Sequence, residues 1–72
     1  MRRLTVHVEG QGYRGSWDTW EDEAWGRMVQ ASHEGWMAQG PVRGEDPERV
    51  ATALLEWCVA RRLHGVRGGR PV

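Results

Sequence analysis

The 72 residues are the length of one small domain, which excludes a two-domain enzyme, a repeat array and a large internal pocket. Ten arginines balance ten acidic residues, so the net charge is zero and the chain is no polycation that would bind nucleic acid through charge alone. The single cysteine excludes an intramolecular disulfide, and we therefore expect a reducing, cytoplasmic location. Apolar runs stay well below the roughly 20 residues of a membrane span, so no membrane association is expected.

The first predicted element is a strand from Arg3 to Glu9. Leu4, Val6 and Val8 alternate with polar residues, which is the period of a half-buried strand. The closely spaced glycines in residues 10–12 indicate a tight turn, after which residues 13–17 are compatible with a second strand.

Residues 16–34 allow two interpretations. As a helix, the segment would begin at a serine cap and end at Gly35, with its acidic residues near the positive end of the helix dipole. As strands, residues 21–23 would form an exposed turn, followed by a strand over 25–31 and a second strand over 36–42.

We favour the strands for two reasons. A glycine closes the short polar segment 32–35, as in a type I hairpin turn with a bulge. In addition, Gly26 in the middle of a helix would cost about 1 kcal/mol relative to alanine.

The last predicted element is a helix that begins after Asp46 and ends near Gly65. Asp46 is a natural N-cap, and Pro47 fits the first helical position. An apolar stripe follows at helical spacing, with further residues that widen it: Val50, Ala53, Leu54, Trp57, Arg61 and Leu63, then Ala51, Leu55 and Cys58. Residues 66–72 lack apolar periodicity and are expected to form a flexible basic tail.

These elements predict an α+β fold, in which an antiparallel three- to four-stranded meander has one C-terminal helix packed on one face. We expect one small domain over residues 1–65. The other face of the sheet would be open to water or to a partner.

The sequence contains no recognisable catalytic or metal-binding motif. His7, His33, Cys58 and His64 do not follow the spacing of a zinc site. Cys58 lies among apolar helical residues, which is typical of a buried thiol and not of a nucleophile. We therefore predict a protein that is not an enzyme and that uses no metal or cofactor.

Tryptophan supplies five of the six aromatic side chains, and each buried aromatic covers about 150–250 Å². Five indoles are many for so small a core, so one or two are expected at the surface. Trp17 and Trp20 lie three residues apart, and on a strand one of them must point to the outer face, where it would anchor a partner. Arg14, Arg61 and Arg62 are the cationic candidates for partner contact.

From Trp25 to Trp57 the sequence resembles the HicB-type antitoxin domain. The resemblance rests on an aromatic strand residue, a turn that ends in glycine, a strand with small residues, an acidic helix start and an Ala/Leu-rich helix: Trp25, Gly35, Ala38, Gly40, Asp46-Pro47-Glu48 and Ala53-Leu54-Leu55. It implies a small sheet with a helix, dimerisation and binding to a cognate RNase toxin.

These features predict a small protein-interaction module with an antitoxin-like or adaptor role, whose partner is another protein and also a second copy of itself. The separation of acidic residues at 18–23 from arginines in the last dozen residues favours such a homodimer. The alternative is a single-stranded nucleic-acid-binding protein, in which sheet tryptophans stack on bases while Arg14, Arg61 and Arg62 contact phosphates.

Overall fold

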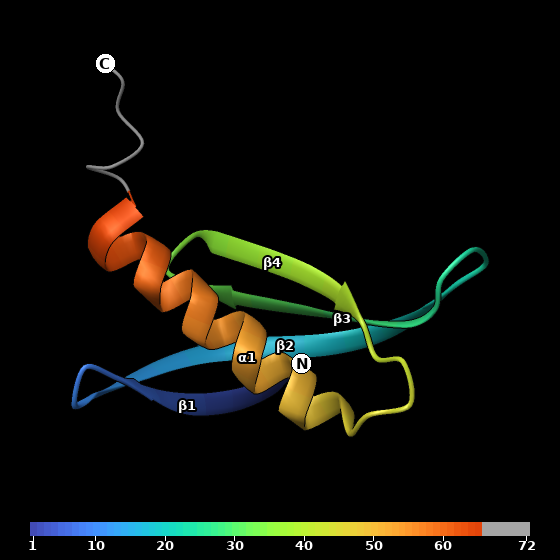
Figure 1. The fold of residues 1–72 in the computed structure, drawn as a ribbon, viewed down its shortest axis with the longest axis horizontal. Helices are drawn as coiled ribbons and strands as arrows, with labels where there is room; N and C mark the ends of the chain where they lie inside the picture. The colour runs from blue at the N-terminus through green and yellow to red at the C-terminus, as the bar shows by residue number, and fades with distance from the viewer. Residues whose placement is uncertain (66–72) are drawn as a thin grey trace, which may run out of the picture.

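The computed structural model describes residues 1–65 and shows four strands followed by one helix (Figure 1). The strands form one antiparallel sheet in the order β1-β2-β3-β4, so each strand pairs with its neighbour in the sequence. The elements are β1 Arg2–Val8, β2 Gln11–Asp22, β3 Gly26–His33, β4 Trp36–Pro41, α1 Pro47–Ala60 and a π-helical turn, η1, Arg61–Gly65. The predicted α+β meander with one C-terminal helix is confirmed, whereas the predicted tail, residues 66–72, lies outside the described residues.

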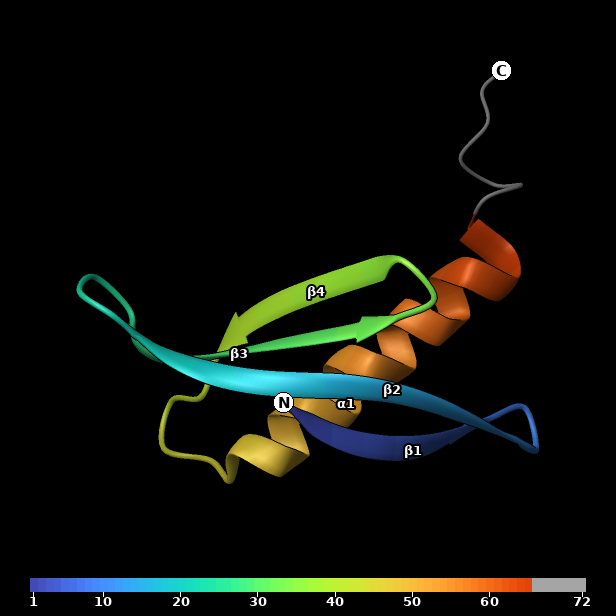
Figure 2. The same ribbon diagram turned by 180° about the vertical axis from the view of Figure 1, so that it is seen from behind.

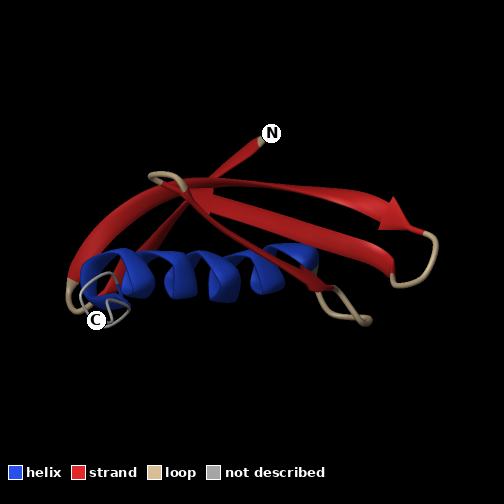
Figure 3. Ribbon diagram, turned by 90° about the horizontal axis from the view of Figure 1, so that it is seen from above, coloured by secondary structure: helices blue, strands red, loops and turns tan. Residues whose placement is uncertain are grey.

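The sheet and the helix form two layers. Seen from above, the strands curve over α1, which covers one face of the sheet (Figure 3). The view from behind shows the strands in front of α1, with the outer face of the sheet turned toward the viewer (Figure 2). Side chains alternate between the two faces, so Val6, Trp17 and Val29 point toward the helix and are buried.

Two-residue turns join β1 to β2 and β3 to β4. Both residues have positive φ in each turn, 54° and 83° in Glu9-Gly10, and 50° and 85° in Glu34-Gly35. These values are those of a type I′ turn, whose twist matches that of the flanking strands. The expected turn over 32–35 is therefore too long, because residues 32 and 33 still pair with β4.

Residues 16–34 form strands, as favoured from the sequence, and the helical interpretation is wrong. β2 is the longest strand, because its first half pairs with β1 and its second half with β3. The turn expected at residues 21–23 begins only after Asp22, whose Oδ1 accepts hydrogen bonds from the amides of Ala24 and Trp25 at 2.8 and 3.1 Å. Gly26 closes this three-residue loop with φ 78°.

Helix α1 begins where the sequence predicts. The Asp46 carboxylate accepts a hydrogen bond from the amide of Glu48 at 3.1 Å, and Pro47 is the first helical residue. The α-helix ends at Ala60, and the π-helical turn continues the chain to Gly65, the predicted end of the helix.

The helix packs on the sheet through a different apolar stripe from the main one that the sequence predicts. Its buried residues are Ala51, Leu55, Cys58 and Val59. They pack against buried residues of the sheet and the loop that follows it: Val6, Trp17, Val29, Ala31 and Val42. Trp57, which the sequence placed in the main stripe, is 49% exposed. Both stripes follow helical spacing, so periodicity alone does not decide which one faces the sheet.

A close approach of α1 to β2 requires glycine at position 15. A Cβ atom there would lie 2.6 Å from the backbone oxygen of Ser32 and 2.9 Å from Cδ2 of Leu55. Both distances are well inside van der Waals contact, so the fully buried Leu55 packs directly on the backbone of β2.

Candidate functional site

An apolar groove of about 440 Å³ lies between the edge strand β4 and helix α1. Six residues line this β4–α1 groove: Met37, Ala38, Gln39, Ala53, Leu54 and Trp57. Two of these side chains are largely exposed, Met37 to 54% and Trp57 to 49%. The half-exposed indole of Trp57 beside an uncharged strand edge is available for contact with a partner. The helix stripe that misses the core therefore meets the edge of the sheet in one apolar surface.

The outer side of β4 is a free strand edge in the part of the chain that the structure describes. The amide of Val42 donates to the carbonyl oxygen of Arg27 at 3.0 Å, which fixes the alternation along the strand. Even-numbered residues of β4 bond to β3, so the backbone N–H and C=O groups of Met37 and Gln39 point away from the sheet. Such a row of unpaired groups is a template for another strand.

Arg61, one of the predicted partner residues, lies at the rim of the β4–α1 groove. Its guanidinium carbon is 5.2 Å from the ring centroid of Trp57. A cation–π contact at an exposed site contributes about 0.5–1 kcal/mol and leaves the other face of the indole free. Arg61 is therefore placed to contact anything that binds Trp57.

Arg62, in contrast, makes contacts inside the domain. Its Nε donates to Nε2 of His33 at 2.9 Å, and its guanidinium carbon lies 5.8 Å from the ring centroid of Tyr13. Because Nε2 of His33 accepts this bond, Nδ1 is the ring nitrogen that donates to the carbonyl oxygen of Arg14 at 2.7 Å. The buried imidazole is thus fully hydrogen-bonded, and Arg62 links the end of the helix to the sheet.

The two tryptophans singled out from the sequence lie on opposite faces of β2, as predicted. Trp17 is only 5% exposed in the core, and the guanidinium carbon of Arg2 lies 5.0 Å from its ring centroid. Trp17 therefore offers almost no surface to a partner of the folded domain. Trp20 is half-buried on the outer face, where it pairs with Met28 of β3. Its contact with a partner stays a prediction.

Arg14 lies away from the groove, beside a shallow hollow of about 270 Å³ on the outer part of the sheet. The hollow is lined from β1, β2, β3 and the following turn by Met1, Arg3, Arg14, Gly15, Ser16, Ser32, His33 and Glu34. The hydroxyls of Ser16 and Ser32 are 3.2 Å apart across the two strands. The predicted site residues are thus not brought together: one is in the core, two lie on the outer face and two lie at the helix end.

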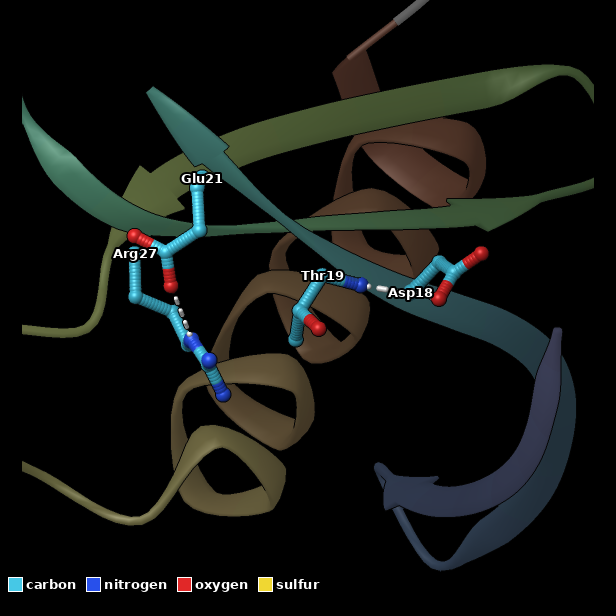
Figure 4. Close-up of polar contacts among 4 residues, drawn as sticks. All are labelled: Asp18, Thr19, Glu21 and Arg27. Atoms are coloured by element: carbon cyan, nitrogen blue, oxygen red, sulfur yellow. Dashed lines mark hydrogen bonds and ion pairs between the residues drawn. The ribbon is translucent and has the colours of Figure 1, made fainter. Parts of the chain in front are cut away.

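The β2–β3 hairpin carries a further exposed indole at its tip, where Trp25 is 65% exposed. Across the two strands, Nε of Arg27 donates to Oε2 of Glu21 at 2.9 Å, and the amide of Thr19 donates to Oδ1 of the adjacent Asp18 at 2.9 Å (Figure 4). The hairpin extends beyond the helix at one end of the molecule (Figure 1). Trp25 is therefore held on an arm, distant from the helix end that carries Arg61.

Within residues 1–65, no group of three His, Cys, Asp or Glu side chains could hold a metal ion. Cys58 is buried with its Sγ 3.9 Å from the carbonyl oxygen of Ala31, and burial raises the pKa of its thiol above the ordinary value of 9.0. A thiol kept neutral is a weak nucleophile, so Cys58 is suited to packing. Among the described helices, none has the length and apolar character needed to cross a membrane.

Besides Met1 at the start of the chain, three exposed large apolar side chains were not predicted as contact residues: Trp25, Met37 and Trp57. A partial signal was present, because residues 36–41 contain no charged side chain and the helix has a second apolar stripe beside the buried one. An uncharged strand and a second apolar helix stripe are each equally compatible with burial in the core. The groove is therefore identified only where the structure brings the two together at one edge of the sheet.

No family model matches the sequence, and no curated protein or solved structure is significantly similar to it. The resemblance to the HicB-type domain therefore stays a prediction.

Proposed function

We propose that this chain is a small, non-enzymatic protein-interaction module whose contact surface is the β4–α1 groove. The observation that carries the proposal is the meeting, in one groove, of the free edge of β4 with the half-exposed indole of Trp57. An antitoxin-like or adaptor role in the cytoplasm is the form of this function that the sequence favours.

The groove offers two sources of binding energy. Burying the exposed half of Trp57 would remove roughly 75–125 Å² of apolar surface from water, which corresponds to about 2–3 kcal/mol. An extended segment placed along β4 would also bond to the outward N–H and C=O groups of Met37 and Gln39, at about 0.5–1.5 kcal/mol for each bond. Together these terms support binding to a protein segment that adds a strand and fills the groove.

Site-specific photo-cross-linking in cells tests this function. A benzophenone amino acid is placed at position 57 or at position 37, and a matched control carries it at Glu56, which is exposed on the same helix but outside the groove. We expect discrete protein adducts from positions 57 and 37 and none from position 56. Absence of adducts at both groove positions, or equal adducts at Glu56, would refute the groove as a protein-binding surface.

Single-stranded nucleic acid is the second candidate, because Arg3 and Arg14 line the same hollow on the outer face of the sheet, which also carries the half-buried Trp20. Binding of an oligonucleotide would then weaken steeply with salt, and Arg14→Ala would lower the slope of log K against log salt by about 0.7. Arg61→Ala, away from that face, would leave the slope unchanged. Fluorescence anisotropy at low salt with no detectable binding removes this candidate.

A further inference from the structure

We infer that the occupant of the β4–α1 groove is a second copy of this chain, joined to the first by antiparallel pairing of β4 with β4 about a twofold axis at Ala38. The inference rests on the proposed function, since it uses the same groove, and it adds the identity and register of the partner. The sheets of the two copies would then form one continuous sheet of eight strands.

The backbone of β4 selects this register. Outward-facing residues are Met37, Gln39 and Pro41, and Pro41 has no N–H to donate. A twofold axis at Ala38 places Met37 opposite Gln39 of the second copy, so every outward N–H of residues 37 and 39 finds a carbonyl oxygen. An axis at Gln39 would form as many bonds in total, but it would place Met37 opposite Pro41 and leave the carbonyl oxygen of Met37 facing a ring without an N–H.

Side-chain charge distinguishes β4 from the other edge of the sheet. β1 carries two arginines, Arg2 and Arg3, and charged side chains on an edge oppose pairing with another strand. β4 carries no charged side chain, so pairing with a copy of itself places no like charges opposite each other. Of the two outer strands in the described chain, β4 is therefore the one suited to self-association.

The groove is also suited to a twofold arrangement on the helix side of the sheet. At the axis, the two Ala38 side chains face each other on that side and leave space because they are small. The helices of both copies would lie on the same face of the continuous sheet, with Leu54 and Trp57 of each copy flanking the axis. The exposed half of Trp57 would thereby be covered on the helix side, whereas Met37 would lie beside Gln39 of the second copy on the outer face of the sheet.

Two charge variants test both the interface and its register by sedimentation equilibrium over a range of micromolar concentrations. In Met37→Glu/Gln39→Glu, each carboxylate would lie opposite another carboxylate of the second copy. In Met37→Lys/Gln39→Glu, each lysine would lie opposite a glutamate. We expect a dimer for the unmodified chain, at least about tenfold weaker dimerisation for the Glu/Glu variant, and retained dimerisation for the Lys/Glu variant.

A third variant tests the backbone contacts directly. Gln39→Pro removes an N–H that points away from β3, so the strand should stay in the sheet while the dimer loses a hydrogen bond in each half. Far-UV circular dichroism of each variant checks that the monomer is folded. A monomeric unmodified chain, or two charge variants that dimerise equally, would overturn the inference. If cross-links from positions 37 and 57 then still join a different protein, the proposed function stands without it.

Discussion

Replacement of Gly15 by alanine should destabilise the domain strongly, although alanine is usually the better strand residue. The added Cβ would lie 2.6 Å from the backbone oxygen of Ser32 and would also overlap Cδ1 of the fully buried Leu55. Ordinary carbon contacts lie at about 3.5–4.0 Å, so either β3 or the helix must move outward. Overpacking of this kind costs about 1–3 kcal/mol.

That loss is large for so short a chain. Stability of about 0.05–0.15 kcal/mol per residue gives the 72 residues about 4–11 kcal/mol in total. For a domain of this length, each kcal/mol corresponds to about 4–8 °C in Tm, so Gly15→Ala should lower Tm by about 4–24 °C.

Gly12→Ala is the matched control on the same strand. Its nearest neighbours would be Nε2 of His7 at 3.5 Å and Cγ2 of Thr5 at 3.6 Å, which are ordinary contacts. Removing a glycine from a strand without steric conflict should raise stability by about 0.5–1 kcal/mol. Thermal unfolding followed by circular dichroism should therefore show Tm shifts of opposite sign for the two variants.

A double variant separates the two conflicts at Gly15. With Leu55→Ala in the background, the overlap with the leucine disappears, whereas the contact with the oxygen of Ser32 remains. The destabilisation by Gly15→Ala should then fall by at least about 0.5 kcal/mol without vanishing. Equal Tm shifts for Gly12→Ala and Gly15→Ala, or a stable Gly15→Ala variant, would show that α1 does not lie this close to β2.

Further substitutions and pH test other contacts of the domain. Arg62→Met should lower the free energy of unfolding in urea by about 1–3 kcal/mol, because Nε2 of buried His33 loses its hydrogen-bond donor. Arg61→Met, which removes only the exposed contact with Trp57, should lower it by at most about 1 kcal/mol. Equal losses would contradict the contact between Arg62 and His33. Burial raises the pKa of the Cys58 thiol above 9.0, so the stability that comes from burying the neutral thiol is present below that pH and is lost as the pH rises through the folded pKa. A thiol reagent at pH 8 should label Cys58 only after unfolding, and fast labelling of the folded chain would disprove burial. Asp46→Ala removes the helix cap and should lower the free energy of unfolding by about 0.5–2 kcal/mol, with Asp46→Asn as the variant that retains most of it.

Local patterns in the sequence account for most of the fold. The alternation of Leu4, Val6 and Val8 predicts a strand with one buried face, and Asp46 with Pro47 fixes the start of the helix. These signals are local, because strand period and helix capping depend on residues that are neighbours in the chain.

The unpredicted features depend on contacts between distant segments. Trp17 faces the core because Val6 pairs with Tyr13, which sets the phase of β2, and no residue next to Trp17 carries that information. Likewise, α1 has two apolar stripes, and the packing of Leu55 against Gly15 decides which of them faces the sheet and leaves Trp57 exposed. The candidate groove therefore becomes visible only when the sheet register and the helix rotation are both known.

The position of α1 after all four strands affects how the domain is made on the ribosome. The helix supplies Ala51, Leu55, Cys58 and Val59 to the core, yet these residues are synthesised after β4 is complete. Whenever the four strands pair before α1 has docked, the inner side of the sheet has no cover. Nascent chains on neighbouring ribosomes would then be prone to aggregate through β4, and a chaperone that shields apolar strands would be of most use in this interval.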